Sequence, residues 1–266
     1  MRRILSIPLL VLTFLLLCVA ILLLWLYAND SVYYRLMQPL SLDDHVRLGD
    51  LYFNQGNDPR GIYDLERAYF HYEQAIRIDH DGHPRPWYEL GRIDFVEGRL
   101  EHALAKLHTQ FELFGNEVSN VHYMLGLVYG YKARESGLAR DWREAERAFV
   151  TFLDLSPEAP WTRVDLAWVY FAQGKYEAML PVLEEGLAYR PDNPWLHNMY
   201  GLALLNTGET ARAREHFLQA EREAAALTTQ AWGLAYAGND PQNWEQGLRE
   251  FRMAIERNLA LTEVRE

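Results

Sequence analysis

A pattern of apolar residues around one small residue recurs along the chain. Residues 45–56 read HVRLGDLYFNQG and residues 122–132 read HYMLGLVYGYK. The small residues of the whole series are 42, 35, 41, 34 and 32 positions apart, and they are Gly49, Gly91, Gly126, Ala167, Gly201 and Gly233. Steps of 34 or 35 residues predict a repeated unit of two helices. The two longer steps predict insertions of about seven residues in the first and third units, which would lengthen or offset the helices at one rim.

A second motif predicts the partner helix of each unit. An alanine is followed four positions later by a large apolar residue at Ala68–Tyr72, Ala103–Leu107, Ala145–Phe149 and Ala213–Phe217. Glycine inside a helix costs ~1 kcal/mol relative to alanine, so its recurrence indicates a close helix-to-helix contact. We therefore expect each small residue to lie where the first helix of a unit crosses the second. One helix pair cannot bury both of its faces, so the units are expected to stack.

Helix-start signals support these boundaries. Ser41-x-x-Asp44 is typical of a capping box at the start of the first helix. Asn193-Pro194 places a cap residue before a proline at the first helical position. The pattern thus predicts an all-α array of about six units over residues 42–258, followed by a tail or short capping helix at 259–266.

The first 28 residues have a different pattern, because no charged residue lies between Ile4 and Ala28. At ~1.5 Å per residue, the 24 residues 4–27 reach about 36 Å, enough to cross roughly 30 Å of hydrocarbon. A cleavable signal has a shorter apolar centre and a small-x-small exit, and Leu26-Tyr27-Ala28 is a poor exit. We predict an uncleaved transmembrane anchor over residues 1–28, in contact with the lipid bilayer through residues 4–27, and a linker over 29–41.

Charge bears on topology and on partners. Arg2 and Arg3 favour a cytoplasmic N-terminus, which places the array on the outer side, periplasmic in a bacterium. The formal charge is −11, and it is −13 without these two arginines. A body this acidic repels phosphate backbones, so nucleic acid is not expected as a partner.

Cys18 is the only cysteine, which excludes a disulfide within the chain and any Cys-based zinc or redox site.

The two motifs together resemble the tetratricopeptide repeat family, whose pattern is W-x-x-L-G-x-x-Y, then A-x-x-x-F, then a proline. Trp87-x-x-Leu90-Gly91 matches the opening of that pattern, and the resemblance covers about residues 42–258. It implies a right-handed superhelix with a concave inner surface. It also implies that five positions of the first helix in each unit line that surface.

Mapped onto this chain, those positions are unusually aromatic. The residues predicted to bind a partner are Tyr88, Arg92, Phe95, Tyr123, Tyr131, Trp161, Trp168, Phe171 and Trp195. Trp, Tyr and Arg are frequent at binding hot spots. The alternative is that the rings pack between neighbouring helices as core. Val46 and Asp50 stand where some family members carry a Lys and Asn clamp for acidic C-termini, so that clamp is absent and an apolar or amphipathic segment is expected instead.

Catalytic and metal sites are not predicted. His80-Asp81-Gly82-His83 has no further ligand at metal-site spacing, so a polar turn is the simpler interpretation. His45, His122 and His197 stand where the repeat often has Trp and are expected to pack. No phosphate loop, nucleophile elbow or HExxH motif is present, so no enzyme and no cofactor are expected.

These features predict a membrane-anchored scaffold that binds other proteins or peptides during assembly of a membrane or envelope complex. A receptor that holds an apolar or lipid-linked small ligand in the aromatic groove for a partner enzyme is the alternative. Self-association of the array is a third prediction, because only LALTEVRE follows the last unit as a candidate for the polar cap that arrays need.

Overall fold

The computed structural model describes residues 14–23, 25, 40–53, 63–115, 120–235 and 241–263. Residues 14–23 form a helix with exposed side chains, and most of the predicted anchor at 4–27, like the linker at 29–41, lies outside the described residues. Within the described part of the chain, no helix has both the length and the apolar character needed to cross a membrane.

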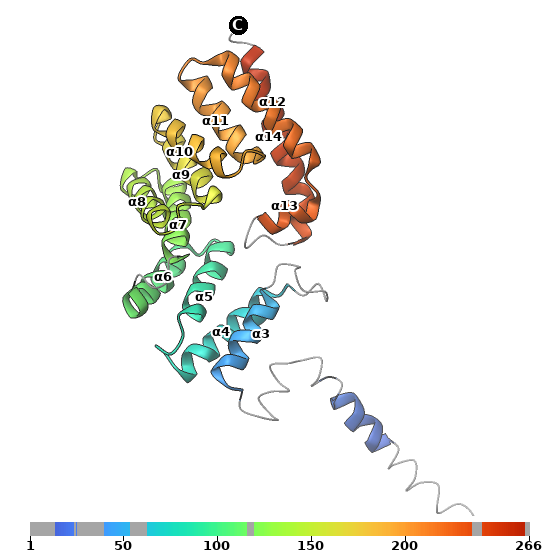
Figure 1. Ribbon diagram of the computed structural model, residues 1–266. Helices are drawn as coiled ribbons and strands as arrows, with labels where there is room; N and C mark the ends of the chain where they lie inside the picture. The colour runs from blue at the N-terminus through green and yellow to red at the C-terminus, as the bar shows by residue number, and fades with distance from the viewer. Residues whose placement is uncertain are drawn as a thin grey trace, which may run out of the picture.

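Five helix pairs follow one another along a curved path from the N-terminal to the C-terminal end of the array (Figure 1). All regular structure in the described residues is helical. The pairs are α3 (Leu42–Tyr52) with α4 (Leu65–Ile78), α5 (Pro84–Val96) with α6 (Leu100–Phe114), α7 (Asn120–Ser136) with α8 (Ala139–Leu155), α9 (Pro160–Ala172) with α10 (Tyr176–Tyr189), and α11 (Pro194–Asn206) with α12 (Thr210–Ala226). Each pair packs on the next, so the fold is an α-solenoid.

The recurring glycines lie at equivalent helix crossings, as the sequence pattern predicted. A Cβ on Gly49 would lie 2.6 Å from the Tyr72 ring, and one on Gly126 would lie 2.5 Å from the Phe149 ring. Gly91 faces Leu107 and Gly201 faces Phe217 in the same way. The facing side chains are fully buried, so the missing Cβ lets the large residue of the second helix reach the backbone of the first.

Two predicted helix starts are confirmed. The Ser41 hydroxyl accepts from the Asp44 amide at 3.2 Å and the Asp44 carboxylate accepts from the Ser41 amide at 3.1 Å, which makes the capping box of α3. Asn193 Oδ1 accepts from the amides of Trp195 and Leu196 at 2.9 and 3.1 Å, ahead of Pro194 in α11. The insertion predicted in the third unit lengthens its first helix, since α7 has 17 residues while α5, α9 and α11 have 13 each. α8 also has 17 residues, but so does α12 of the fifth unit, for which no insertion was predicted.

At the C-terminal end, the sixth small residue of the series also faces a large side chain, since a Cβ on Gly233 would lie 2.0 Å from the Trp244 ring. α13 is described over Thr229–Ala235, up to residues that lie outside the described ranges, and a short 3-10 turn, Pro241–Asn243, precedes the 20-residue α14 (Trp244–Glu263). α14 packs against α12 and α11, as α11 packs against α10 and α9, so α14 takes the place of a further first helix. Trp232 and Trp244 pack with Trp195, and this cluster brings α14 next to α11. Residues 259–263 continue α14 and do not form a separate cap.

Candidate functional site: the inner surface of the first helices

Eight of the nine residues predicted to bind a partner are half-buried on three successive first helices, α5, α7 and α9. We call this set the inner surface; its members are Tyr88, Arg92, Phe95, Tyr123, Tyr131, Trp161, Trp168 and Phe171. Partial exposure leaves each of them able to contact a ligand while it also packs against a neighbouring helix. The rings of this set therefore pack against the core, and their role in binding stays a prediction.

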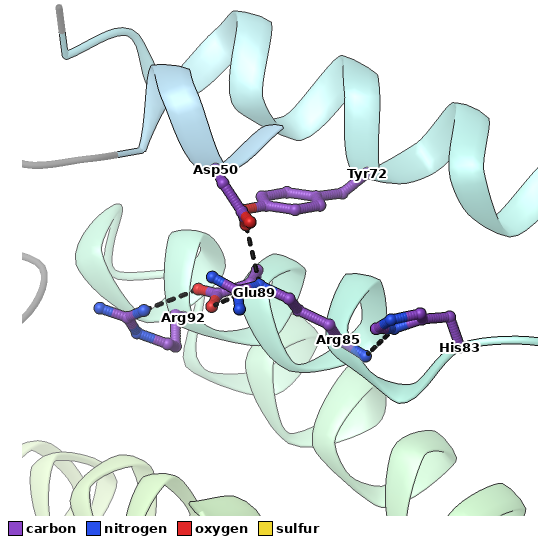
Figure 2. A network of polar contacts seen from close by, with 6 residues as sticks. All are labelled: Asp50, Tyr72, His83, Arg85, Glu89 and Arg92. Carbon is purple, nitrogen blue, oxygen red and sulfur yellow. Dashed lines mark hydrogen bonds and ion pairs between the residues drawn. The ribbon is translucent and has the colours of Figure 1, made fainter. Parts of the chain in front are cut away.

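A polar network joins the first two units at the N-terminal end of the inner surface (Figure 2). Arg85 of α5 donates from Nε to Asp50 Oδ1 of α3 at 2.8 Å, and the Tyr72 hydroxyl of α4 donates to the same oxygen at 2.7 Å. Glu89, buried in α5, pairs with Arg92 at 2.7 Å and with Arg85 at 3.8 Å. Two carboxylates and two guanidinium groups thus balance in charge across the α3–α5 contact.

Burial and charge act in opposite directions on Glu89. Burial raises the pKa of its carboxyl group above the ordinary value, and Arg92 and Arg85 lower that pKa. The guanidinium of Arg92 also lies over the rings of Phe53 and Tyr88, at 4.7 and 5.7 Å from their centroids. Arg92 is therefore engaged on both sides within the protein, so we assign it to the link between units.

An aromatic row runs across the middle of the inner surface. The Phe95 and Tyr131 rings meet edge to face at 5.0 Å, and Tyr131 lies 5.6 Å from Trp168. The indole of Trp168 covers Gly130 of α7, where a Cβ would lie 2.5 Å from it, and meets Trp142 of α8 edge to face. This row links α5, α7 and α9, so three units present one continuous aromatic surface.

Asp165 lies beside this row and was not predicted. The Tyr123 hydroxyl of α7 donates to Asp165 Oδ2 of α9 at 3.0 Å. Burial raises the pKa of Asp165 to about 7, and the hydrogen bond from Tyr123 opposes that rise. A signal was available, because Asp165 is the only acid in the apolar helix PWTRVDLAWVYFA.

The C-terminal end of the inner surface differs from the expectation for Trp195. Its side chain is only 7% exposed, and its ring stacks on Phe251 at 4.8 Å and on Trp232 at 5.3 Å. Trp195 is therefore a core residue, because α13 and α14 cover it. Trp161 stays half-buried and meets the Trp195 ring edge to face at 4.8 Å. Phe171, at the end of α9, packs against Tyr176 of α10 at 5.6 Å.

The histidines pack, as the repeat pattern predicted. His45 and His71 approach through their Nδ1 atoms at 3.0 Å, and His197 and His216 do so at 2.9 Å, at equivalent places in the first and fifth units. Burial, His197 and Arg212 lower the pKa of His216 to about 4, which keeps that ring uncharged at neutral pH.

The polar turn predicted at residues 80–83 is built around a helix cap. His83 caps α5, because its Nδ1 accepts from the Arg85 amide at 3.1 Å. His80 packs edge to face against Trp87, and its carbonyl accepts from the Trp87 indole at 3.0 Å. Across the described ranges, no three His, Cys, Asp or Glu residues lie close enough to hold a metal ion.

The fold described above is that of a helical-repeat protein. A sequence model of the tetratricopeptide repeat family matches residues 138–178 and 164–227. Residues 138–227 are therefore similar to the tetratricopeptide repeat family. Proteins of this family are generally scaffolds and not enzymes. Among curated proteins, no sequence is significantly similar to this chain.

Solved structures support the same fold. A thermophilic TPR protein of Thermus thermophilus is 16% identical, with a TM-score of 0.57 over 81% of this chain and 100% of that protein. MamA residues 41 to the end, from Desulfovibrio magneticus, are 14% identical, with a TM-score of 0.58 over 70% of this chain and 96% of that one. Another MamA structure is 17% identical, with a TM-score of 0.56 over 69% and 92% of the two chains.

Proposed function

We propose that the protein is a membrane-anchored scaffold whose inner surface binds a segment of a partner protein during assembly of a membrane or envelope complex. The observation that carries the proposal is the row of half-buried rings Phe95, Tyr131 and Trp168 on three successive first helices. Partly exposed aromatic surface of this extent favours a binding site. The apolar segment at residues 4–27 supports the anchor, and Arg2 and Arg3 before it support an outer location for the array.

Site-specific photo-crosslinking in cells tests the binding surface. A photoreactive phenylalanine analogue replaces Tyr131 on the inner surface, or Val150, which is 39% exposed on α8, as the matched control. We expect Tyr131 to give a discrete crosslinked partner that Val150 does not give. Crosslinks from Val150 alone would contradict a role for the inner surface.

Native mass spectrometry of the detergent-solubilised full chain separates the scaffold from the alternative, a receptor for an apolar small ligand. Co-purification of a small molecule that is lost from Trp168→Ala, with no protein crosslinked at Tyr131, would favour the receptor.

A further inference from the structure

Asp165 is a carboxylate beside the aromatic row, and no cation of the described residues pairs with it. It is half-buried on α9, and Tyr123 donates to its Oδ2 at 3.0 Å. The ion pairs found in the described ranges join other residues. A carboxylate that is partly removed from water and has no cation beside it lowers the stability of the folded protein. Residues that reduce stability in this way are concentrated at functional sites.

The equivalent carboxylate of the second unit shows what Asp165 lacks. Glu89 precedes Leu90-Gly91 as Asp165 precedes Leu166-Ala167, so the two acids occupy the same place in the repeat. Glu89 pairs with Arg92 at 2.7 Å and with Arg85 at 3.8 Å. Val164 and Trp168 of α9 are one residue before and three after Asp165, where α5 carries Tyr88 and Arg92 around Glu89. The place of the Arg92 cation is therefore taken by an aromatic ring in the fourth unit.

The surroundings of Asp165 favour a cation from outside the chain. Two tyrosines of α7 interact with Asp165 across the α7–α9 contact. Against the effect of burial, the hydrogen bond from Tyr123 lowers the pKa of Asp165, and burial together with the charge of Asp165 raises the pKa of Tyr131. Trp168 adds a third ring face nearby, and ring faces attract Lys and Arg side chains. Arg134 already lies over the Tyr131 ring, 4.4 Å from its centroid, and is engaged there instead of pairing with Asp165.

We propose that the inner surface recognises a partner segment that carries one Lys or Arg between apolar residues, and that Asp165 pairs with this cation. The inference rests on the proposed function and names the chemistry of its partner. The aromatic row binds the apolar side chains, and Asp165 fixes the register of the segment through charge complementarity. The acidic body, −13 without Arg2 and Arg3, attracts the same kind of segment at long range.

Selection from a phage-displayed library of random dodecapeptides on the full-length protein in mild detergent tests this inference. Three proteins are compared: wild type, Asp165→Asn, and Asp154→Asn as the control, because Asp154 is an exposed acid on α8. We expect wild type and Asp154→Asn to enrich peptides with one basic residue flanked by apolar residues. Asp165→Asn should lose the basic preference and keep the apolar one, since the aromatic row is intact.

The outcomes separate the inference from the proposed function. Enrichment of purely apolar peptides by wild type, unchanged in Asp165→Asn and lost in Trp168→Ala, would overturn the pairing with Asp165 and leave the scaffold function in place. If wild type enriches no peptide over blank beads, both are overturned.

A double-mutant cycle on one enriched peptide measures the pair directly. Replacing the basic residue of the peptide by norleucine should weaken binding to wild type by about ten- to a hundredfold, and binding to Asp165→Asn by less than about threefold. Equal losses on both proteins would contradict the pairing. If Asp165→Asn does not fold, as judged by circular dichroism, the norleucine peptide on wild type still decides whether the cation contributes.

Discussion

At the scale of single residues, Gly126 shows how a missing side chain sets the distance between two helices. The Phe149 ring occupies the space that a Cβ on Gly126 would need, at 2.5 Å. In the fourth unit, the equivalent positions hold Ala167 instead of glycine and Leu183 instead of an aromatic residue, and both side chains are fully buried. The pairing of a small residue with a large one is therefore a property of the crossing and not of glycine itself.

We predict that Gly126→Ala lowers the free energy of unfolding by ~1–3 kcal/mol, because overpacking outweighs the gain of ~1 kcal/mol in helix propensity. Chemical denaturation followed by circular dichroism measures the change. The double variant Gly126→Ala/Phe149→Leu, which copies the fourth unit, should recover part of the loss. No recovery would show that the crossing distance is set elsewhere.

Asp165 gives a pH-dependent prediction. Its folded pKa of about 7 lies above the usual value for an Asp side chain in an unfolded chain, ~3.9. The penalty for its charge is therefore absent at low pH, grows as the pH rises between these two values, and is complete above pH ~7. Asp165→Asn removes the charge, and its amide oxygen still accepts from Tyr123.

We expect Asp165→Asn to raise the free energy of unfolding by roughly 1–3 kcal/mol at pH 8 and by less at pH 5. Thermal unfolding at the two pH values measures this difference. Asp154→Asn, on an exposed site, should change stability by less than about 0.5 kcal/mol at either pH. A variant that is less stable than wild type at pH 8 would show that the Asp165 charge is already compensated in the protein.

At the scale of helices, α14 covers the C-terminal end of the last regular helix pair. It packs on α12 and α11 in the place of a further first helix, and it covers Trp195 together with α13. Arg252 of α14 donates to the carbonyls of Ala224, Ala225 and Leu227 at 3.0 to 3.2 Å, which satisfies the end of α12. α14 therefore closes the last regular unit through both an aromatic cluster and a helix cap.

Trp195→Ala tests this assignment. Because the ring is buried among Trp232, Trp244 and Phe251, we predict a loss of ~3–5 kcal/mol in the free energy of unfolding. Trp161→Ala, which removes a half-buried ring from the same cluster, should cost less. Differential scanning calorimetry compares the two. A stable Trp195→Ala protein with weakened partner binding would contradict the assignment to the core and show that Trp195 belongs to the inner surface.

The helices themselves were predictable to a large extent, because spacing and capping are local properties of the sequence. Gly49, Gly126 and the Ser41 capping box each follow from the residues within a few turns. The end of the array was not predictable in this way. Whether α13 or α14 stands next to α11 depends on how three tryptophan rings pack across residues far apart in the chain. The inner surface was predicted from five positions of each first helix that the family resemblance implies, and Asp165 is not at one of them.

At the scale of the whole molecule, the proposed membrane anchor gives a prediction about the side of the membrane on which the array lies. Arg2 and Arg3 precede the apolar segment at residues 4–27, and the rest of the chain carries −13. We predict that alkaline phosphatase, fused to the C-terminus and active only outside the cytoplasm, is active. A cytoplasm-specific fluorescent reporter at the same position should be dark. The reverse pattern would place the array in the cytoplasm.

In the described residues, five first helices, α3, α5, α7, α9 and α11, follow one another, and α14 packs beyond them. Packed helices lie roughly 8–10 Å apart, so these five span about 32–40 Å. An extended chain of ~3.3 Å per residue crosses that span in about ten to twelve residues. Under the proposed function, the bound segment would therefore be one short linear stretch of polypeptide, and such stretches can be carried by the unstructured tails of many otherwise unrelated proteins.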